Sequence, residues 1–146
     1  MKTVHLLHNE RNWKNMKRLF GLKALFIVYT FFAAIGGFGE ALAPHQFVGS
    51  FLTSLNADGA FMAQNTGVFQ AGTAIIAFMA RNVRENVVLR SLLVGFTLIN
   101  AGVVAVAVQQ MVSRGTVSSD GIGDLIIHGL MAVWFGYYLV ASLAKR

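Results

Sequence analysis

Two ionisable side chains near the start of the last apolar stretch offer the sharpest chemistry in the sequence. Asp124 and His128 are four residues apart, so on a helix they share one face. A carboxylate in that position can exchange a proton with the imidazole or hold its ring in one orientation. The pair predicts either proton or ligand handling, or a hydrogen bond that directs His128 towards a neighbouring helix.

A second acid and imidazole, Glu40 and His45, follow the first apolar stretch. Joined to Asp124 and His128, they would form a cluster able to hold a metal or the head group of a quinone. Tight metal-ligand spacing of the His-Glu-x-x-His kind does not occur in the sequence, so we expect no metal site.

No residue is assigned to catalysis. The chain has no cysteine, which excludes thiolate catalysis and sulfur-ligated metal clusters. Its serines lack the flanking glycines of a nucleophile elbow. The sequence therefore favours a protein that is not an enzyme.

Amide side chains interrupt the apolar stretches. Polar groups in hydrocarbon are costly, so they mark helix packing or function, and amides hydrogen-bond well between membrane helices. Together with the ionisable residues they complete the candidate ligand-binding set: Glu40, His45, Gln64, Asn65, Gln70, Asn100, Asp124 and His128.

The elements that must position these residues are membrane-spanning helices. The 146-residue chain is 55% hydrophobic and only 12% charged, against about 25% charged in soluble domains. Crossing hydrocarbon takes about 20 helical residues, and the charges leave four such stretches, at about 19–43, 59–80, 91–113 and 125–144. Apolar and polar residues do not alternate within these stretches, which excludes the strands of a membrane β-barrel. We predict an all-α, integral membrane four-helix bundle over residues 19–146, preceded by a basic leader at 1–18.

Two further short helices are expected at the membrane surface. The leader carries scattered apolar residues and Trp13, which suits an interfacial helix. In the first outer loop, Phe47, Phe51 and Leu55 repeat at the i, i+4 spacing of one helical face, which predicts an interfacial helix after Pro44. A signal-peptide alternative, with cleavage after Ala41-Leu42-Ala43, is disfavoured by the long leader and by proline directly after the cut.

The positive charge predicts topology. Eleven of the twelve Lys and Arg residues lie in the first 23 residues, in the 81–90 turn or in the C-terminal tail, and only Arg114 lies elsewhere. Because Lys and Arg stay cytoplasmic, both termini are expected in the cytoplasm. The positive charge therefore predicts membrane lipids as partners, with anionic head groups bound at the Arg11–Lys23 cluster. We expect no nucleic acid partner.

Glycine spacing predicts where helices approach closely. Gly95 and Gly102, and likewise Gly129 and Gly136, are seven residues apart, which is two helical turns. Each pair therefore lies on one face and is expected to pack within the bundle, with a dimer interface as the alternative.

The layout resembles the small four-helix bacterial membrane proteins of the DoxX-like kind. The resemblance is carried by the basic N-terminus, by Glu-Ala-Leu-Ala-Pro at Glu40–Pro44 and by the polar and small start of the second span, Ala63–Gly67. Some members are associated with quinone-linked oxidoreductase complexes, so the resemblance implies a bacterial inner membrane location and a possible quinone. It transfers no site residue to this chain.

Three functions remain open from the sequence. The first is a non-catalytic subunit of a larger membrane complex, built with other subunits or with itself, or a binder of a lipid-like small molecule. The second is a quinone-linked oxidoreductase component in which Glu40, Asp124 and His128 handle protons. The third is a small dimeric transporter, although the uneven charge disfavours an antiparallel dimer.

Overall fold

The computed structural model describes residues 2–48, 55–114 and 119–144, with side chains from residue 21 onwards except at residues 110, 114, 119–121 and 124. Five helices follow one another along the described chain: α1 (Lys2–Leu42), α2 (Pro44–Phe47), α3 (Ala57–Ala80), α4 (Asn86–Arg114) and α5 (Ser119–Leu143). No strand occurs among these residues, so the all-α prediction is confirmed for them.

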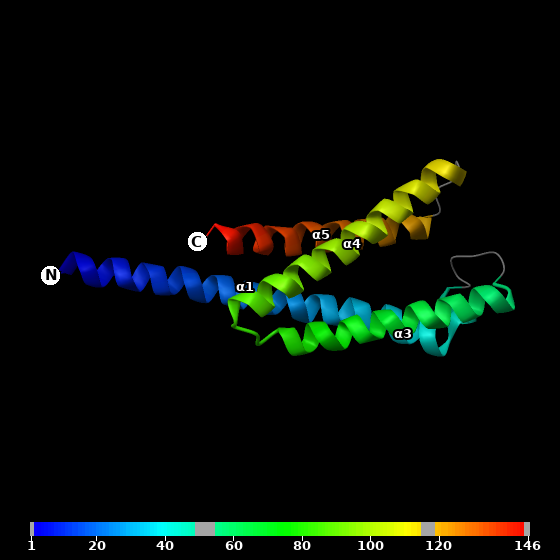
Figure 1. Ribbon diagram of the computed structural model, residues 1–146, viewed down its shortest axis with the longest axis horizontal. Helices are drawn as coiled ribbons and strands as arrows, with labels where there is room; N and C mark the ends of the chain where they lie inside the picture. The colour runs from blue at the N-terminus through cyan, green and yellow to red at the C-terminus, as the bar shows by residue number, and fades with distance from the viewer. Residues whose placement is uncertain (1, 49–54, 115–118, 145–146) are drawn as a thin grey trace.

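The four long helices form two antiparallel hairpins. α1 packs along α3 and α4 packs along α5, while contact between the hairpins is mainly between α1 and α5. The hairpins lie together at the end nearest both termini and separate towards the other end, where α4 rises away from α3 (Figure 1). The fold is therefore a pair of joined hairpins rather than four helices packed evenly along their length.

Within the described residues, three helical segments are long and apolar enough to cross a membrane: Gly21–Leu42, Asn86–Ser113 and Leu125–Leu143. They correspond to the first, third and fourth predicted spans. The second predicted span, 59–80, does form a helix, α3. It is not among the three because Gln64, Asn65 and Gln70 lower its hydropathy.

The leader is not a separate helix. α1 runs unbroken for 41 residues, which at 1.5 Å per residue is about 60 Å, and its N-terminal part extends beyond the other helices (Figure 1). Neither proline nor glycine occurs between Lys2 and Phe20, so nothing local breaks the helix between leader and span.

Helix starts follow local sequence rules. Pro44 occupies the first turn of α2, where its missing N–H costs nothing. The Oδ1 atom of Asn56 accepts the N–H of Gly59 at 2.8 Å and caps α3. The short helix α2 begins at Pro44 and ends at Phe47, and the rest of the predicted interfacial helix, including Phe51, falls largely on residues 49–54, which lie outside the described residues.

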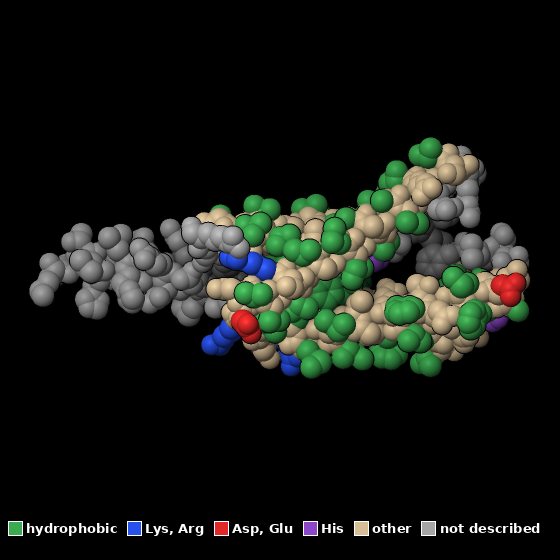
Figure 2. Space-filling model, viewed as in Figure 1, with side chains coloured by type: hydrophobic (Ala, Val, Ile, Leu, Met, Phe, Trp, Pro, Cys, Tyr) green, Lys and Arg blue, Asp and Glu red, His purple; other side chains and the backbone are tan. Residues whose placement is uncertain are grey.

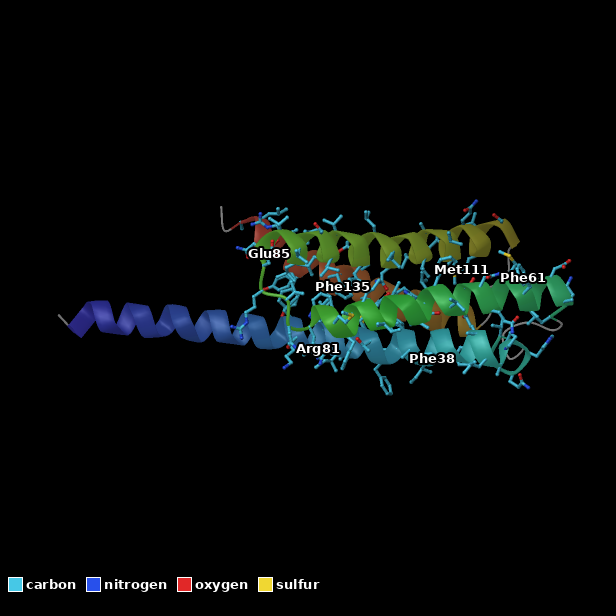
Figure 3. All side chains as sticks on the ribbon, turned by 60° about the horizontal axis from the view of Figure 1, so that its bottom comes forward. Phe38, Phe61, Arg81, Glu85, Met111 and Phe135 are labelled. Atoms are coloured by element: carbon cyan, nitrogen blue, oxygen red, sulfur yellow. The ribbon has the colours of Figure 1, made fainter. Side chains whose placement is uncertain are left out.

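An aromatic cluster from three helices forms the centre of the core. The rings of Phe26 and Tyr29 in α1 meet Phe96 in α4 and Phe135 in α5, with centroid separations between 4.8 and 5.8 Å. Phe135 lies in the interior between the helices, whereas Phe38 points outwards (Figure 3). The cluster joins the two hairpins at the end that carries both termini.

Small residues let α1 and α3 approach closely. A Cβ atom added at Gly67 would lie 2.7 Å from the carbonyl oxygen of Gly37, and one added at Gly36 would lie 2.7 Å from Nε2 of Gln70. Both separations are shorter than real Cβ contacts. The buried face of α3 continues this pattern with Ala71, Ala74, Ala77 and Ala80.

Of the glycines predicted to pack, Gly136 alone meets a neighbour among the described residues. Nothing lies within 4 Å of a Cβ added at Gly95, Gly102 or Gly129, and Gly136 meets only the Thr97 methyl at 3.8 Å. Seven-residue spacing places glycines on one helical face, but it does not say which neighbour that face meets. The close approach instead uses the glycines of α1 and α3.

Candidate functional site

Asn100 and His128 form a buried polar pair between α4 and α5. The Nδ1 atom of His128 lies 2.8 Å from Oδ1 of Asn100. Asn100 is completely buried and its Nδ2 donates to the Phe96 carbonyl at 2.7 Å, whereas His128 is partly exposed. Two predicted candidates, 28 positions apart in the sequence, are thus brought together from two helices.

The amide orientation determines the histidine tautomer. Because Nδ2 of Asn100 donates to a carbonyl, Oδ1 faces His128 and acts as an acceptor. The Nδ1 atom of His128 must then carry the hydrogen and donate it. The Nε2 atom lies on the side of the ring away from Asn100.

Hydroxyl groups extend this pair to the other hairpin. The Tyr29 hydroxyl of α1 interacts with the Asn100 side chain and donates to Oγ1 of Thr73 in α3 at 3.4 Å. Thr73 in turn donates to the Gln70 carbonyl at 2.8 Å. His128, Asn100, Tyr29 and Thr73 therefore form a polar network, called here the inter-hairpin network, to which each long helix contributes one side chain.

The network lies at the outer edge of the shared core. On α4, Leu93, Phe96 and Asn100 are buried, and no described residue from Ala101 to Ser113 is. On α5, burial begins at Met131, and no described residue before it is buried. Beyond the network the hairpins separate, and the space-filling view shows an opening between them (Figure 2). The network therefore forms the floor of this inter-hairpin opening.

Gln70 lies one helical turn outward from Thr73 on α3. Its amide packs against Gly36 of α1 and is partly exposed. Because positions i and i+3 share a helical face, Gln70 lies on the side of α3 where Thr73 meets Tyr29 of α1.

Other candidates lie at the far end of the first hairpin. The Gln64 amide donates to the Ala41 carbonyl at 3.4 Å, and Asn65 donates to the Phe61 carbonyl of its own helix at 3.1 Å. Glu40 is partly buried, with its Cβ beside Gly67. His45 is exposed on α2, which contacts α1 and α3.

The predicted Asp124 and His128 pair lies partly outside the described residues, because the side chain of Asp124 is among those not described. Among the side chains that are described, no three His, Asp or Glu residues come close enough to hold a metal ion. The described part of the site is thus a hydrogen-bonding network of amide, imidazole and hydroxyl groups.

Replacing Asn100 with leucine is expected to lower the free energy of unfolding by about 1–3 kcal/mol, because His128 loses its acceptor inside the bundle. Unfolding by sodium dodecyl sulfate in mixed micelles measures the change. Gln109→Leu on the exposed face of the same helix is the control and should change the free energy by under about 0.5 kcal/mol. Equal losses in the two variants would contradict a structural network at Asn100.

Tyr29 and Thr73 were not predicted as site residues. Hydroxyl side chains are common in membrane helices, where they bond to carbonyls of their own helix, as Thr30 does to Phe26 at 2.7 Å. The sequence gives no signal that distinguishes Tyr29 or Thr73 from such residues. Their role depends on how the two hairpins meet.

The helical fold and its three membrane-capable segments place the chain in the class of helical integral membrane proteins. Comparisons with known proteins go no further, since no family model, curated protein or solved structure matches the chain.

Proposed function

We propose that this chain is a four-span membrane protein that binds a lipid-like molecule in the inter-hairpin opening, without acting on it chemically. The observation that carries the proposal is the inter-hairpin network, which places hydrogen-bonding groups where two largely apolar hairpins separate. Pockets of this kind, apolar with a few convergent polar groups, are typical of small-molecule sites.

Chain direction supports α3 as the fourth span. Leu25, near the start of the first apolar segment, and Leu93, near the start of α4, pack in the same core. Both segments therefore begin at the same end of the bundle. If α1 and α4 both cross the membrane, α3 must cross it in the opposite direction between them. The outward side of α3 is also apolar, with Phe69 77% and Met79 69% exposed, which suits contact with lipid. Its exposed amides, Gln64 and Asn65, donate to backbone carbonyls.

The charge distribution supports cytoplasmic termini. The described basic side chains, Lys23, Arg81, Arg84 and Arg90, lie at the end of the bundle near both termini, together with the acid Glu85 (Figure 3). The other two described acids, Glu40 and Asp58, lie towards the opposite end. Figure 2 shows blue side chains gathered at the first end. By the positive-inside rule this end is cytoplasmic and the opening faces the outer leaflet; a bacterial inner membrane is the proposed location.

Mass spectrometry of the intact protein tests the binding proposal. Purified in mild detergent and incubated with a total bacterial lipid extract, the protein is expected to retain one apolar molecule per chain. Ala107→Trp should abolish retention, because Ala107 lies two turns beyond Asn100 on the same side of α4 and is partly exposed. Ala105→Trp, on the opposite and exposed side, should not.

Two results would reject this function. One is a protein that retains no molecule under any condition. The other is equal retention by the Ala107→Trp and Ala105→Trp variants, because the bound lipid would then lie on the outer surface. Stoichiometric copurification of another membrane protein without a small molecule would favour the alternative of a non-catalytic subunit.

A quinone-linked role is the second candidate, and the partly exposed imidazole of His128 at the network is the observation that favours it. It agrees with the proposed resemblance to DoxX-like proteins. A bound quinone whose retention survives His128→Ala would count against this role. A dimeric transporter ranks third, because the basic side chains gather at one end of the bundle and an antiparallel dimer needs a balanced distribution.

A further inference from the structure

We propose that the N-terminal part of α1 pairs in parallel with the same segment of a second copy of this chain, which makes the protein a dimer joined outside the membrane. The surface that pairs is a row of residue positions on α1, called here the leader stripe: Leu6, Asn9, Trp13, Met16 and Phe20. The inference does not depend on the binding function proposed above.

The leader stripe has the spacing of a coiled-coil helix. Its five residues follow one another at intervals of three, four, three and four, which places them on one side of a helix. Four of the five are apolar, whereas the residues between them are mostly polar. A helix with such an apolar stripe normally packs it against another element.

The continuous helix carries the stripe away from the membrane and from the bundle. α1 runs unbroken from Lys2 to Leu42, and its membrane-capable segment begins at Gly21. Along the helix axis Trp13 lies about 12 Å and Leu6 about 22 Å before Gly21, beyond head groups that occupy roughly 5–8 Å on each side of the hydrocarbon. This part of α1 also extends beyond the other described helices (Figure 1). The apolar stripe therefore needs a partner from outside this bundle.

The side of α1 that carries the stripe is open where the bundle begins. Lys23 continues the same spacing three residues after Phe20, and Ile27 follows four residues later. Lys23 is exposed and Ile27 is 46% exposed, whereas Leu22 and Leu25 pack in the core. The long Lys23 side chain can turn its charge to water. A second α1 can therefore approach the stripe without meeting the rest of the bundle.

Asn9 favours an identical partner. In a parallel pair of identical helices the same positions meet, so Asn9 lies opposite Asn9 of the second copy and the two amides can hydrogen-bond. In a shifted register, or against an unrelated apolar helix, each amide would face apolar side chains without a hydrogen-bond partner, which is costly. Two copies inserted with the same topology also point the same way, as parallel pairing requires.

Charge along the leader agrees with a parallel pair of copies. Arg11 and Arg18 occupy positions on the side of the helix opposite the stripe, so pairing keeps these charges apart. The positions that flank the stripe set partner choice in coiled coils. Across the two copies they bring together His5 with Glu10 and Asn12 with Lys17. Neither flanking pair joins like charges, and one joins an acid to an imidazole.

Disulfide cross-linking in native membranes tests the interface. The chain has no cysteine, so a single introduced cysteine can link only to its counterpart in another copy or to a different protein. We expect oxidised Met16→Cys, on the stripe, to give a product of twice the chain's mass. Asn15→Cys, which lies away from the stripe on the same helix, is the matched control and should stay at the mass of one chain. Both positions precede the packed bundle, so the fold of the spans is kept.

A charge placed on the stripe gives an independent measurement. In mild detergent, native mass spectrometry at stepped concentrations yields the dissociation constant of the dimer. Met16→Glu should raise it at least about tenfold, because two like charges would face each other. Asn15→Glu adds the same charge away from the stripe and should leave the constant unchanged within about twofold.

Three results would overturn the inference. The first is equal cross-linking of Met16→Cys and Asn15→Cys, or cross-linking of neither. The second is a cross-linked product between Met16→Cys and a protein of different mass, because an unrelated partner would then cover the stripe. The third is an equal effect of Met16→Glu and Asn15→Glu on a dimer that does form, because the two copies would then meet elsewhere.

Discussion

Replacing Phe135 with alanine is expected to lower the free energy of unfolding by about 3 kcal/mol. Phe135 is completely buried and lies at the meeting point of the two hairpins. Its ring stacks on Phe96 at 5.1 Å and meets Phe26 and Tyr29 edge-on at 5.6 and 5.4 Å. Removing the ring leaves a cavity whose lining loses its dispersion contacts, so the loss falls on the contact that joins the hairpins.

Phe31→Ala provides the matched control for this experiment. The Phe31 side chain is 61% exposed on the same bundle, so its removal should change the free energy by under about 0.5 kcal/mol. Unfolding in mixed micelles of sodium dodecyl sulfate measures both variants. If the two variants lost equal stability, the hairpins would not be joined through this aromatic core.

The positions of the spans could be predicted because they depend only on composition along the chain. Three apolar stretches between charged segments became the three membrane-capable helices, at nearly the predicted bounds. α3 shows the limit of this argument. Its three amides lower its hydropathy, so its proposed membrane-spanning role rests on its place between α1 and α4 and on its apolar outward side.

The candidate site could be predicted in part. Asn100, His128 and Gln70 stood out because amide and imidazole groups are costly inside apolar helices. The sequence could not predict that Asn100 would hydrogen-bond to His128, because that contact joins two helices. Nor could it predict that Glu40 and His45 would not cluster with His128; among the described side chains, no three His, Asp or Glu residues lie together.

The glycines show the same limit in the packing. Gly95 and Gly102 were expected to pack because their spacing defines a face, whereas Gly36 and Gly37 carried no such pattern. In the structure, the second pair faces α3 and the first pair meets nothing within 4 Å. The spacing of glycines defines a face on one helix, but whether that face is packed depends on where a second helix crosses it.

Enlarging Gly67 is the sharpest test of that crossing. Gly67→Leu is expected to cost about 3 kcal/mol of unfolding free energy, at the upper end of ordinary overpacking penalties, because its Cβ would lie 2.7 Å from the Gly37 carbonyl oxygen and 2.8 Å from the Glu40 Cβ. Helix backbone cannot yield as a flexible side chain does, so α1 and α3 must move apart.

Gly102→Leu, in open space, should leave stability unchanged or raise it by up to about 0.8 kcal/mol through helix propensity. The same unfolding measurement compares them, and a loss at Gly102 as large as at Gly67 would mean that α4, not α1, carries the close helix contact.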